Sequence, residues 1–193
     1  MMFELPWRGV DRLAAPLELR EAGRRDGARY LEHLALIVAE TQFMLQSAAD
    51  PLPDITEQKD ILEDYARRPN CVCIVAARPG PPAGKQGIIG SVTLVGGRSR
   101  RTAHAADLSM GVNRAAWGRG IGATLLDAAL TWARTSPMLM RVSLSVYSEN
   151  RVAAALYRSR GFLDEGVLVH YAKCDGRYDD LIGMGIAVGG GDA

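Results

Sequence analysis

A glycine-rich turn between a strand-like segment and an amphipathic segment constrains the fold of this chain more than any other feature. Residues 105–112 (AADLSMGV) alternate like a half-buried strand, and glycines follow at positions 118, 120 and 122. Apolar residues then recur at helical spacing and predict an amphipathic helix over residues 120–134: Leu125, Leu126, Ala129, Leu130 and Ala133. The glycines therefore lie at the N-terminus of a helix that follows a strand.

This position favours the binding of an anion. The first N–H groups of a helix have no internal acceptor, and the helix dipole has its positive end there. Glycines at these positions let phosphate oxygens approach the backbone, and Arg119 adds a positive charge. We therefore predict that a pyrophosphate cradle is formed by Gly118, Arg119, Gly120, Ile121, Gly122 and Ala123.

Two well-known phosphate-binding motifs fit the same glycines less well. A dinucleotide fingerprint requires GxGxxG after the first strand of a βαβ unit and an acidic residue on the second strand, whereas this chain has GxGxG without that acid. A Walker loop requires Gly-Lys followed by Ser or Thr, which is absent here. A turn that only caps a helix and binds no ligand stays open as an interpretation.

A second segment makes the prediction more specific. Residues 141–146 (RVSLSV) alternate like a strand, and residues 150–157 predict a short helix that ends before Gly161. Gly118-Arg-Gly-Ile-Gly-Ala and Asn150-x-x-Ala153-x-x-Leu156-Tyr157-x-x-x-Gly161-Phe162 together resemble the cofactor motifs of the GCN5-related N-acetyltransferase (GNAT) family. One departure is Trp117, where many members have Gln or Arg. Because backbone N–H groups form most of the cradle, we expect cofactor binding to survive it.

The resemblance covers about residues 17–188. It assigns strands to residues 17–22, 71–77 and 87–96, helices to 26–39 and 56–67, and a closing hairpin to 171–184 that is similar to the amino-acid and phosphinothricin branch of small-amine acetyltransferases. It implies an α/β (α+β) GNAT fold, with a mixed, mostly antiparallel central sheet of six to seven strands and about four helices on its two sides. We expect one N-acetyltransferase domain over residues 1–193, with a loop at 78–85 and a flexible tail at 189–193.

Composition agrees with one compact enzyme domain. The chain has 193 residues, 48% of them hydrophobic, and a net charge of +1 without a basic stripe, so we expect no nucleic-acid partner. No apolar run approaches the ~20 residues of a membrane span, and the N-terminus does not resemble a signal peptide. We therefore expect a cytoplasmic protein.

The three cysteines and three histidines lack metal-binding spacing, so no metal is expected. The arginines of residues 96–103 favour a solvated turn over an anion site.

The resemblance implies direct transfer of the acetyl group from acetyl-CoA to an amine. Backbone groups of Met110, Gly111 and Val112 would hold the pantetheine arm and polarise the acetyl carbonyl, where two family strands diverge. Asn150 would bond along the arm, and Tyr157 would be the general acid. Asn150 could also be only a helix cap and Tyr157 only a packed ring. Asp107 is a candidate base acting through water, although its side chain could equally face solvent.

The acceptor is the least determined part of the function. The closing hairpin favours a primary amine of a small metabolite, such as an amino acid or an analogue, and a homodimer is possible. Five acidic residues keep a polyamine acceptor open: Glu40, Asp50, Asp54, Glu57 and Asp60. A protein N-terminus as acceptor also stays open, as does a CoA-binding sensor module without catalysis.

Overall fold

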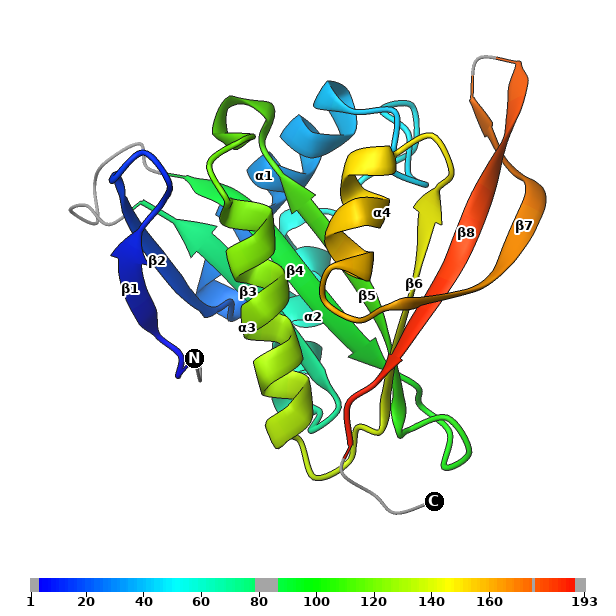
Figure 1. The fold of residues 1–193 in the computed structure, drawn as a ribbon. Helices are drawn as coiled ribbons and strands as arrows, with labels where there is room; N and C mark the ends of the chain where they lie inside the picture. The colour runs from blue at the N-terminus through cyan, green and yellow to red at the C-terminus, as the bar shows by residue number, and fades with distance from the viewer. Residues whose placement is uncertain (1–3, 79–86, 175, 190–193) are drawn as a thin grey trace.

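The computed structural model describes residues 4–78, 87–174 and 176–189, and within them eight strands form one sheet in the order β1-β2-β3-β4-β5-β6-β8-β7 (Figure 1). The strands are β1 (Trp7–Val10), β2 (Pro16–Glu21), β3 (Cys71–Ala77), β4 (Ile88–Gly96), β5 (Ala105–Val112), β6 (Arg141–Tyr147), β7 (Leu163–Cys174) and β8 (Arg177–Ala187). All neighbouring strands are antiparallel except β5 and β6, which are parallel.

Two pairs of helices cover the two faces of this sheet (Figure 1). Helices α1 (Gly27–Glu40) and α2 (Ile55–Arg67) lie on one face, and α3 (Ile121–Thr135) and α4 (Arg151–Arg158) lie on the other. Short 3-10 turns precede α1 and α3, at η1 (Arg24–Asp26) and η2 (Arg114–Ala116). The predicted class, a mixed and mostly antiparallel sheet between helices, is therefore confirmed.

Strand β3 shows why the sheet needs helices on both faces. Its sequence CVCIVAA is an apolar run without polar alternation, as expected of a strand buried on both sides. Val72, Ile74 and Ala76 join the large core with α3, while Cys73 and Val75 join a second core with Tyr30 of α1 and Leu62 of α2. One continuous apolar strand thus supplies both cores.

The sheet has one strand more than the six to seven predicted. Strand β1 has four residues, too short for an alternating pattern to be recognised, and it is held by pairing with β2 from Trp7↔Leu19 to Val10↔Pro16. The predicted loop at 78–85, apart from Arg78, and the predicted tail at 189–193, apart from Gly189, lie outside the described residues. Within the part of the chain that the structure describes, no helix is long and apolar enough to cross a membrane.

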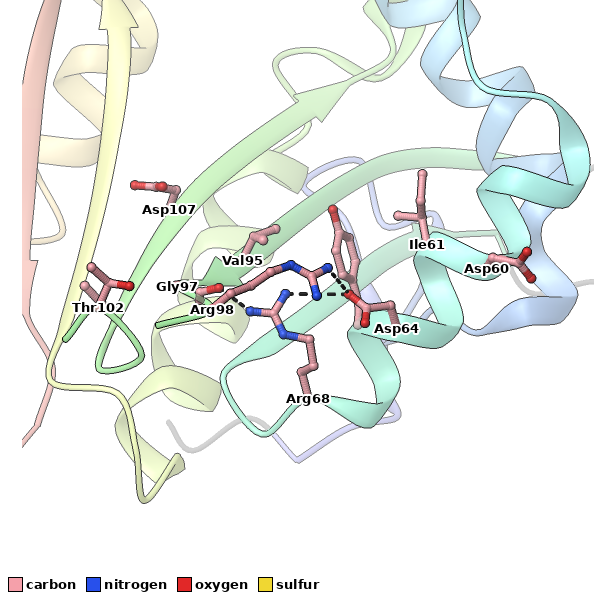
Figure 2. A pocket seen from close by; sticks show the side chains of 12 residues that line it. Asp60, Ile61, Asp64, Arg68, Val95, Gly97, Arg98, Thr102 and Asp107 are labelled. Carbon is pink, nitrogen blue, oxygen red and sulfur yellow. Dashed lines mark hydrogen bonds and ion pairs between the residues drawn. The ribbon is translucent and has the colours of Figure 1, made fainter. Parts of the chain in front are cut away.

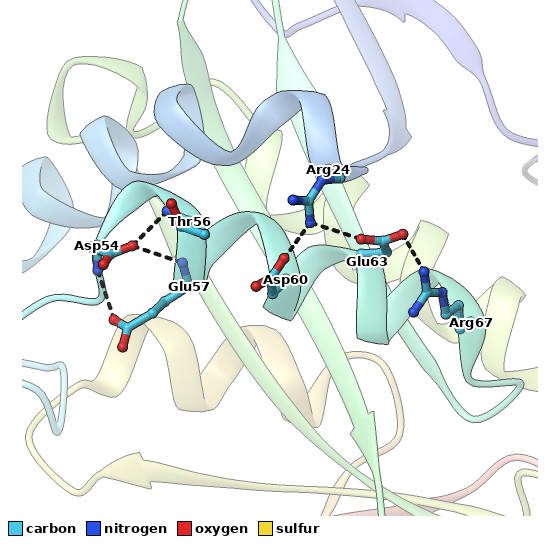
Figure 3. Close-up of polar contacts among 7 residues, drawn as sticks. All are labelled: Arg24, Asp54, Thr56, Glu57, Asp60, Glu63 and Arg67. Carbon is cyan, nitrogen blue, oxygen red and sulfur yellow. Dashed lines mark hydrogen bonds and ion pairs between the residues drawn. The ribbon is translucent and has the colours of Figure 1, made fainter.

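Polar contacts fix helix α2 at its N-terminus and along its length (Figure 3). Asp54 accepts hydrogen bonds from the Thr56 and Glu57 amides at 2.6 and 2.9 Å, and Glu57 accepts one from the Asp54 amide at 2.9 Å, which is a reciprocal capping box. Further along the helix, the Arg24 guanidinium of η1 bridges Asp60 and Glu63. Several acidic side chains of this region therefore have structural partners.

Candidate active site

Strands β5 and β6 diverge in the middle of the sheet. They pair only from Ala105↔Arg141 to Asp107↔Ser143, after which β6 continues to Tyr147 alongside β8. Strand β5 continues to Val112 paired with β4 alone. Residues 108–112 therefore present a strand edge of about 17 Å, at roughly 3.3 Å per residue, without a partner strand on the β6 side.

The glycine turn between η2 and α3 holds a row of free donors. Within the described residues, the backbone N–H groups of residues 118–123 donate to no protein acceptor. The first helical bond of α3 runs from Thr124 N to Gly120 O at 3.0 Å. Gly118 and Gly120 have φ values of 72° and 83°, in the left-handed region that favours glycine. These free donors lie at the start of a 15-residue helix, which is an arrangement that can hold an anion.

Helix α4 brings the second motif next to the cradle. A β-carbon at Gly122 would lie 3.7 Å from Leu156 of α4 and 3.8 Å from Met110 and Val112 of β5. One residue of each motif, Gly122 and Leu156, therefore lies in contact distance of the other, beside Met110 and Val112 of β5.

Trp117, the departure from the family pattern, folds back on the end of β5 and bonds its last residue. Its indole Nε1 donates to the Val112 carbonyl at 2.6 Å, and the Arg114 guanidinium lies 5.8 Å from its ring centroid. Val112 is predicted from the sequence to offer free backbone groups, yet one lone pair of its carbonyl is already used by this indole. The sequence carries no signal for this contact, because it depends on how the turn folds back on the strand.

Asn150 and Tyr157 lie at the two ends of α4. Asn150 is the N-cap, and its Oδ1 accepts a hydrogen bond from Ala153 N at 3.2 Å. Tyr157 is buried and packs edge-on against Phe162, with ring centroids 5.7 Å apart. Burial raises the pKa of Tyr157 to about 12, and its hydroxyl has no hydrogen-bond partner within the described residues. At neutral pH the hydroxyl is therefore protonated and able to donate.

A buried histidine network, which no sequence pattern predicts, holds the carboxyl end of β5. His33 of α1 is 2% exposed, with Nδ1 2.7 Å from Asn113 Oδ1 and Nε2 2.9 Å from Ser91 Oγ. Asn113 Nδ2 in turn donates to the Ile88 carbonyl at 3.2 Å, so Nδ1 of His33 is the donor to Asn113 Oδ1. Burial lowers the pKa of His33 to about 4, so the ring is neutral at pH 7. A lone histidine in an amphipathic segment carries no signal for such a role.

Asp107 stands at the last paired position of β5, where the two strands begin to diverge. Its neighbours Ala106 and Leu108 are in the core on the α3 side, so the exposed Asp107 side chain lies on the opposite face, that of α1 and α2. It borders a pocket of about 700 Å³ (Figure 2). This pocket is formed by α2, the end of β4, the start of β5 and the loop between them: Asp60, Ile61, Asp64, Tyr65, Arg68, Val95, Gly96, Gly97, Arg98, Thr102, Ala105 and Asp107.

Charges of both signs line this pocket. Asp64 pairs with Arg98 at 2.8 Å and with Arg68 at 3.6 Å. The Asp107 carboxylate has no hydrogen bond or ion pair within the described residues. The pocket therefore presents three carboxylates and two guanidinium groups at the base of the strand divergence, and Asp107 is the carboxylate without an ion pair among the described residues. No three His, Cys, Asp or Glu side chains of the described residues gather as a metal site.

A free strand edge that leads away from a helix N-terminus with unpaired N–H groups is the arrangement that the resemblance to the GNAT enzymes implied. The profile of the Acetyltransferase (GNAT) family matches residues 39–162, well over half of the chain. The chain belongs to this family, a class of enzymes that takes the acetyl group from acetyl-CoA.

The sequence identity between this chain and individual relatives is low. The spermidine N(1)-acetyltransferase of Vibrio cholerae is 39% identical over 64 residues, which are 33% of this chain and 37% of that enzyme. A GNAT-family acetyltransferase from Streptococcus pneumoniae superposes with a TM-score of 0.82 at 28% identity, over 89% of this chain and 99% of that one. A phosphinothricin acetyltransferase from Sinorhizobium meliloti, solved in complex with AcCoA, gives a TM-score of 0.76 at 20% identity, over 91% and 90% of the two chains. At 20% identity, the last likeness shows the fold alone.

Proposed function

We propose that this protein is an N-acetyltransferase that moves the acetyl group of acetyl-CoA directly to the primary amine of a small metabolite. The observation that carries the proposal is one continuous path. It starts at the free N–H groups of residues 118–123, follows the unpaired edge of β5, and ends at Asp107 beside the pocket. The pyrophosphate binds at the start, the pantetheine arm lies along the edge, and the acceptor enters from the pocket.

Each residue has a chemical task in this proposal. The backbone N–H group of Met110 bonds the arm and stabilises negative charge on the acetyl oxygen, as oxyanion donors do in acyl transfer. The backbone groups of Gly111, also predicted for this role, face β4, where Gly111 pairs with Ser91. Asn150 uses its carbonyl as a helix cap, which leaves its amide hydrogens for the arm. Tyr157 protonates the departing thiolate, and Asp107 takes a proton from the attacking amine through water.

The pocket supports an acceptor that carries both an amine and a carboxylate. Asp107 would attract the ammonium group, while the guanidinium of Arg98 has donors beyond the one paired with Asp64. A free amino acid or a close analogue matches this pattern of charge. The mixed lining suits a zwitterion better than a polycation.

The acidic residues that favour a polyamine in the sequence have local partners in the structure. Asp54 and Glu57 form the capping box of α2, and Asp60 pairs with Arg24 (Figure 3). Glu40 accepts a hydrogen bond from the Arg114 amide at 2.6 Å, and Asp50 accepts one from the Ser47 amide at 2.7 Å. Polyamine acetylation stays the second candidate because of the partial match to the spermidine enzyme.

A competition assay tests the acceptor. Amino acids, spermidine and a short peptide are offered together at equal concentration with acetyl-CoA, and the acetylated products are identified by mass spectrometry. We expect an acetylated amino acid to dominate, and Asp107→Asn to lower its kcat/KM by ~10²-fold while acetyl-CoA binding stays unchanged. Preferred acetylation of spermidine or of the peptide would overturn the choice of acceptor, and full activity of the Asn variant would remove Asp107 from catalysis.

A further inference from the structure

The turn between β1 and β2 packs against the cradle, although it lies about a hundred residues earlier in the sequence. Arg12 N donates to the Arg119 carbonyl at 3.0 Å, and the Arg119 Nε lies 2.8 Å from Asp11 Oδ2. In Figure 1 this turn lies at the same end of the sheet as the start of α3. The turn between β1 and β2 therefore contributes residues beside the cradle that the family motifs do not include.

Asp11 holds this turn in place. Its side chain is fully buried, and Oδ1 accepts hydrogen bonds from the Leu13 and Ala15 amides at 2.9 and 3.1 Å. Oδ2 pairs with Arg78 at 2.6 Å and with Arg119. Burial alone would raise the pKa of Asp11, but the hydrogen bonds from Arg78 and these two amides lower it to about 2. Asp11 is therefore ionised, and it offsets the positive charge that Arg119 was predicted to lend to the cradle.

Arg12 places a positive charge beside the cradle, which is the role that the sequence suggested for Arg119. Its side chain lies across Gly120, because a β-carbon at this glycine would be 3.0 Å from Arg12 Nε and 3.1 Å from Arg12 Cγ. Arg12 is exposed, and its guanidinium makes no hydrogen bond or ion pair within the described residues. An unpaired guanidinium therefore lies beside a row of unpaired backbone N–H groups.

We infer that Arg12 binds the pyrophosphate of CoA from the side opposite the backbone cradle, with Asp11 as the residue that positions the turn. This rests on the proposed function, because it names a further contact for the same cofactor. A guanidinium offers a phosphate a full positive charge together with two parallel N–H donors, whereas the donors of a backbone cradle are uncharged. The site thus combines neutral donors from the helix with one cation from the N-terminal hairpin.

The test measures the affinity of Arg12→Ala for CoA and for dephospho-CoA, which lacks the 3′-phosphate, by titration calorimetry. Loss of one charge-assisted contact weakens binding by about tenfold. Since the pyrophosphate is common to both ligands, the loss should be equal for both, and Arg12→Lys should restore part of it. The matched control is Arg8→Ala on the same hairpin, whose side chain is 77% exposed and pairs with Glu18 away from the cradle. This control should bind both ligands like the parent protein.

The outcomes separate this inference from the proposed function. If the parent protein binds neither ligand, the proposed function fails and this inference with it. If the parent protein binds and Arg12→Ala binds equally well, only the role of Arg12 is wrong. A loss confined to CoA would overturn the pyrophosphate assignment, because the contact would then be to the 3′-phosphate. The melting temperature of each free variant, equal to that of the parent protein, shows that the fold is intact.

Discussion

Replacing Gly122 with glutamate should raise or preserve the stability of the free protein while weakening cofactor binding by about a hundredfold. Gly122 is in the first turn of α3, and a β-carbon there meets only ordinary contacts of 3.7 to 3.8 Å. Glutamate is a better helix residue than glycine by roughly 0.5 to 1 kcal/mol. An acid near a helix N-terminus adds about 0.3 to 1 kcal/mol. The apolar side chains around the position offset part of this gain.

The free variant should therefore be between 0 and about 1 kcal/mol more stable, which is a rise in melting temperature of at most about 2–4 °C for a chain of this size. In the parent protein, CoA at about a hundred times its Kd should add ~2.7 kcal/mol, or roughly 5–10 °C. A carboxylate about 4 Å from the pyrophosphate costs roughly 1 to 4 kcal/mol of repulsion. If affinity falls a hundredfold, the same CoA concentration adds only ~0.4 kcal/mol, about 1 °C.

Thermal melts with and without CoA test both expectations: a free variant that is at least as stable as the parent protein, and a smaller stabilisation by CoA. Gly166→Glu is the matched control, because it adds the same charge on strand β7, where a β-carbon has open space. Its shift with CoA should equal that of the parent protein. An undiminished CoA shift in Gly122→Glu would refute the cradle. A parent protein that CoA does not stabilise would refute the cofactor itself.

Two further changes test the acid and the buried histidine. Tyr157→Phe removes a hydroxyl that has no partner within the described residues, so folding and acetyl-CoA binding should persist while kcat falls by ~10²-fold; unchanged turnover in steady-state kinetics would leave Tyr157 a packing residue. Burial lowers the pKa of His33 from 6.5 to about 4, so the unfolded chain binds a proton between these values that the folded chain does not. The stability that neutral His33 preserves is fully present above pH 6.5 and decreases by up to ~1.4 kcal/mol per unit as pH falls to 4. Urea unfolding from pH 4 to 7 should show this slope in the parent protein and a flatter one in His33→Gln, and equal slopes would contradict the assignment.

Local patterns in the sequence determined much of this protein. The alternation of residues 105–112 and 141–146 predicted β5 and β6, and the spacing of apolar residues after the glycines predicted α3. The position of the glycines at the start of a helix predicted the free N–H groups, because these depend on a few neighbouring residues. Chemistry that lies within one turn of chain is visible in the sequence.

Only the tertiary structure decided which distant groups meet at the site. The edge of β5 is unpaired because its pairing with β6 stops at Asp107↔Ser143. The resemblance implied that two strands diverge there, but no local pattern in the residues shows where the pairing stops. Local patterns also do not show three further contacts: the hydrogen bond from Trp117 to the Val112 carbonyl, those of His33 with Asn113 and Ser91, and the ion pair of Arg119 with Asp11. Residue type predicted that these side chains could bond or carry charge. The partners were decided by the packing of helices and hairpins around one sheet, because a side chain bonds whichever group the fold brings within about 3 Å.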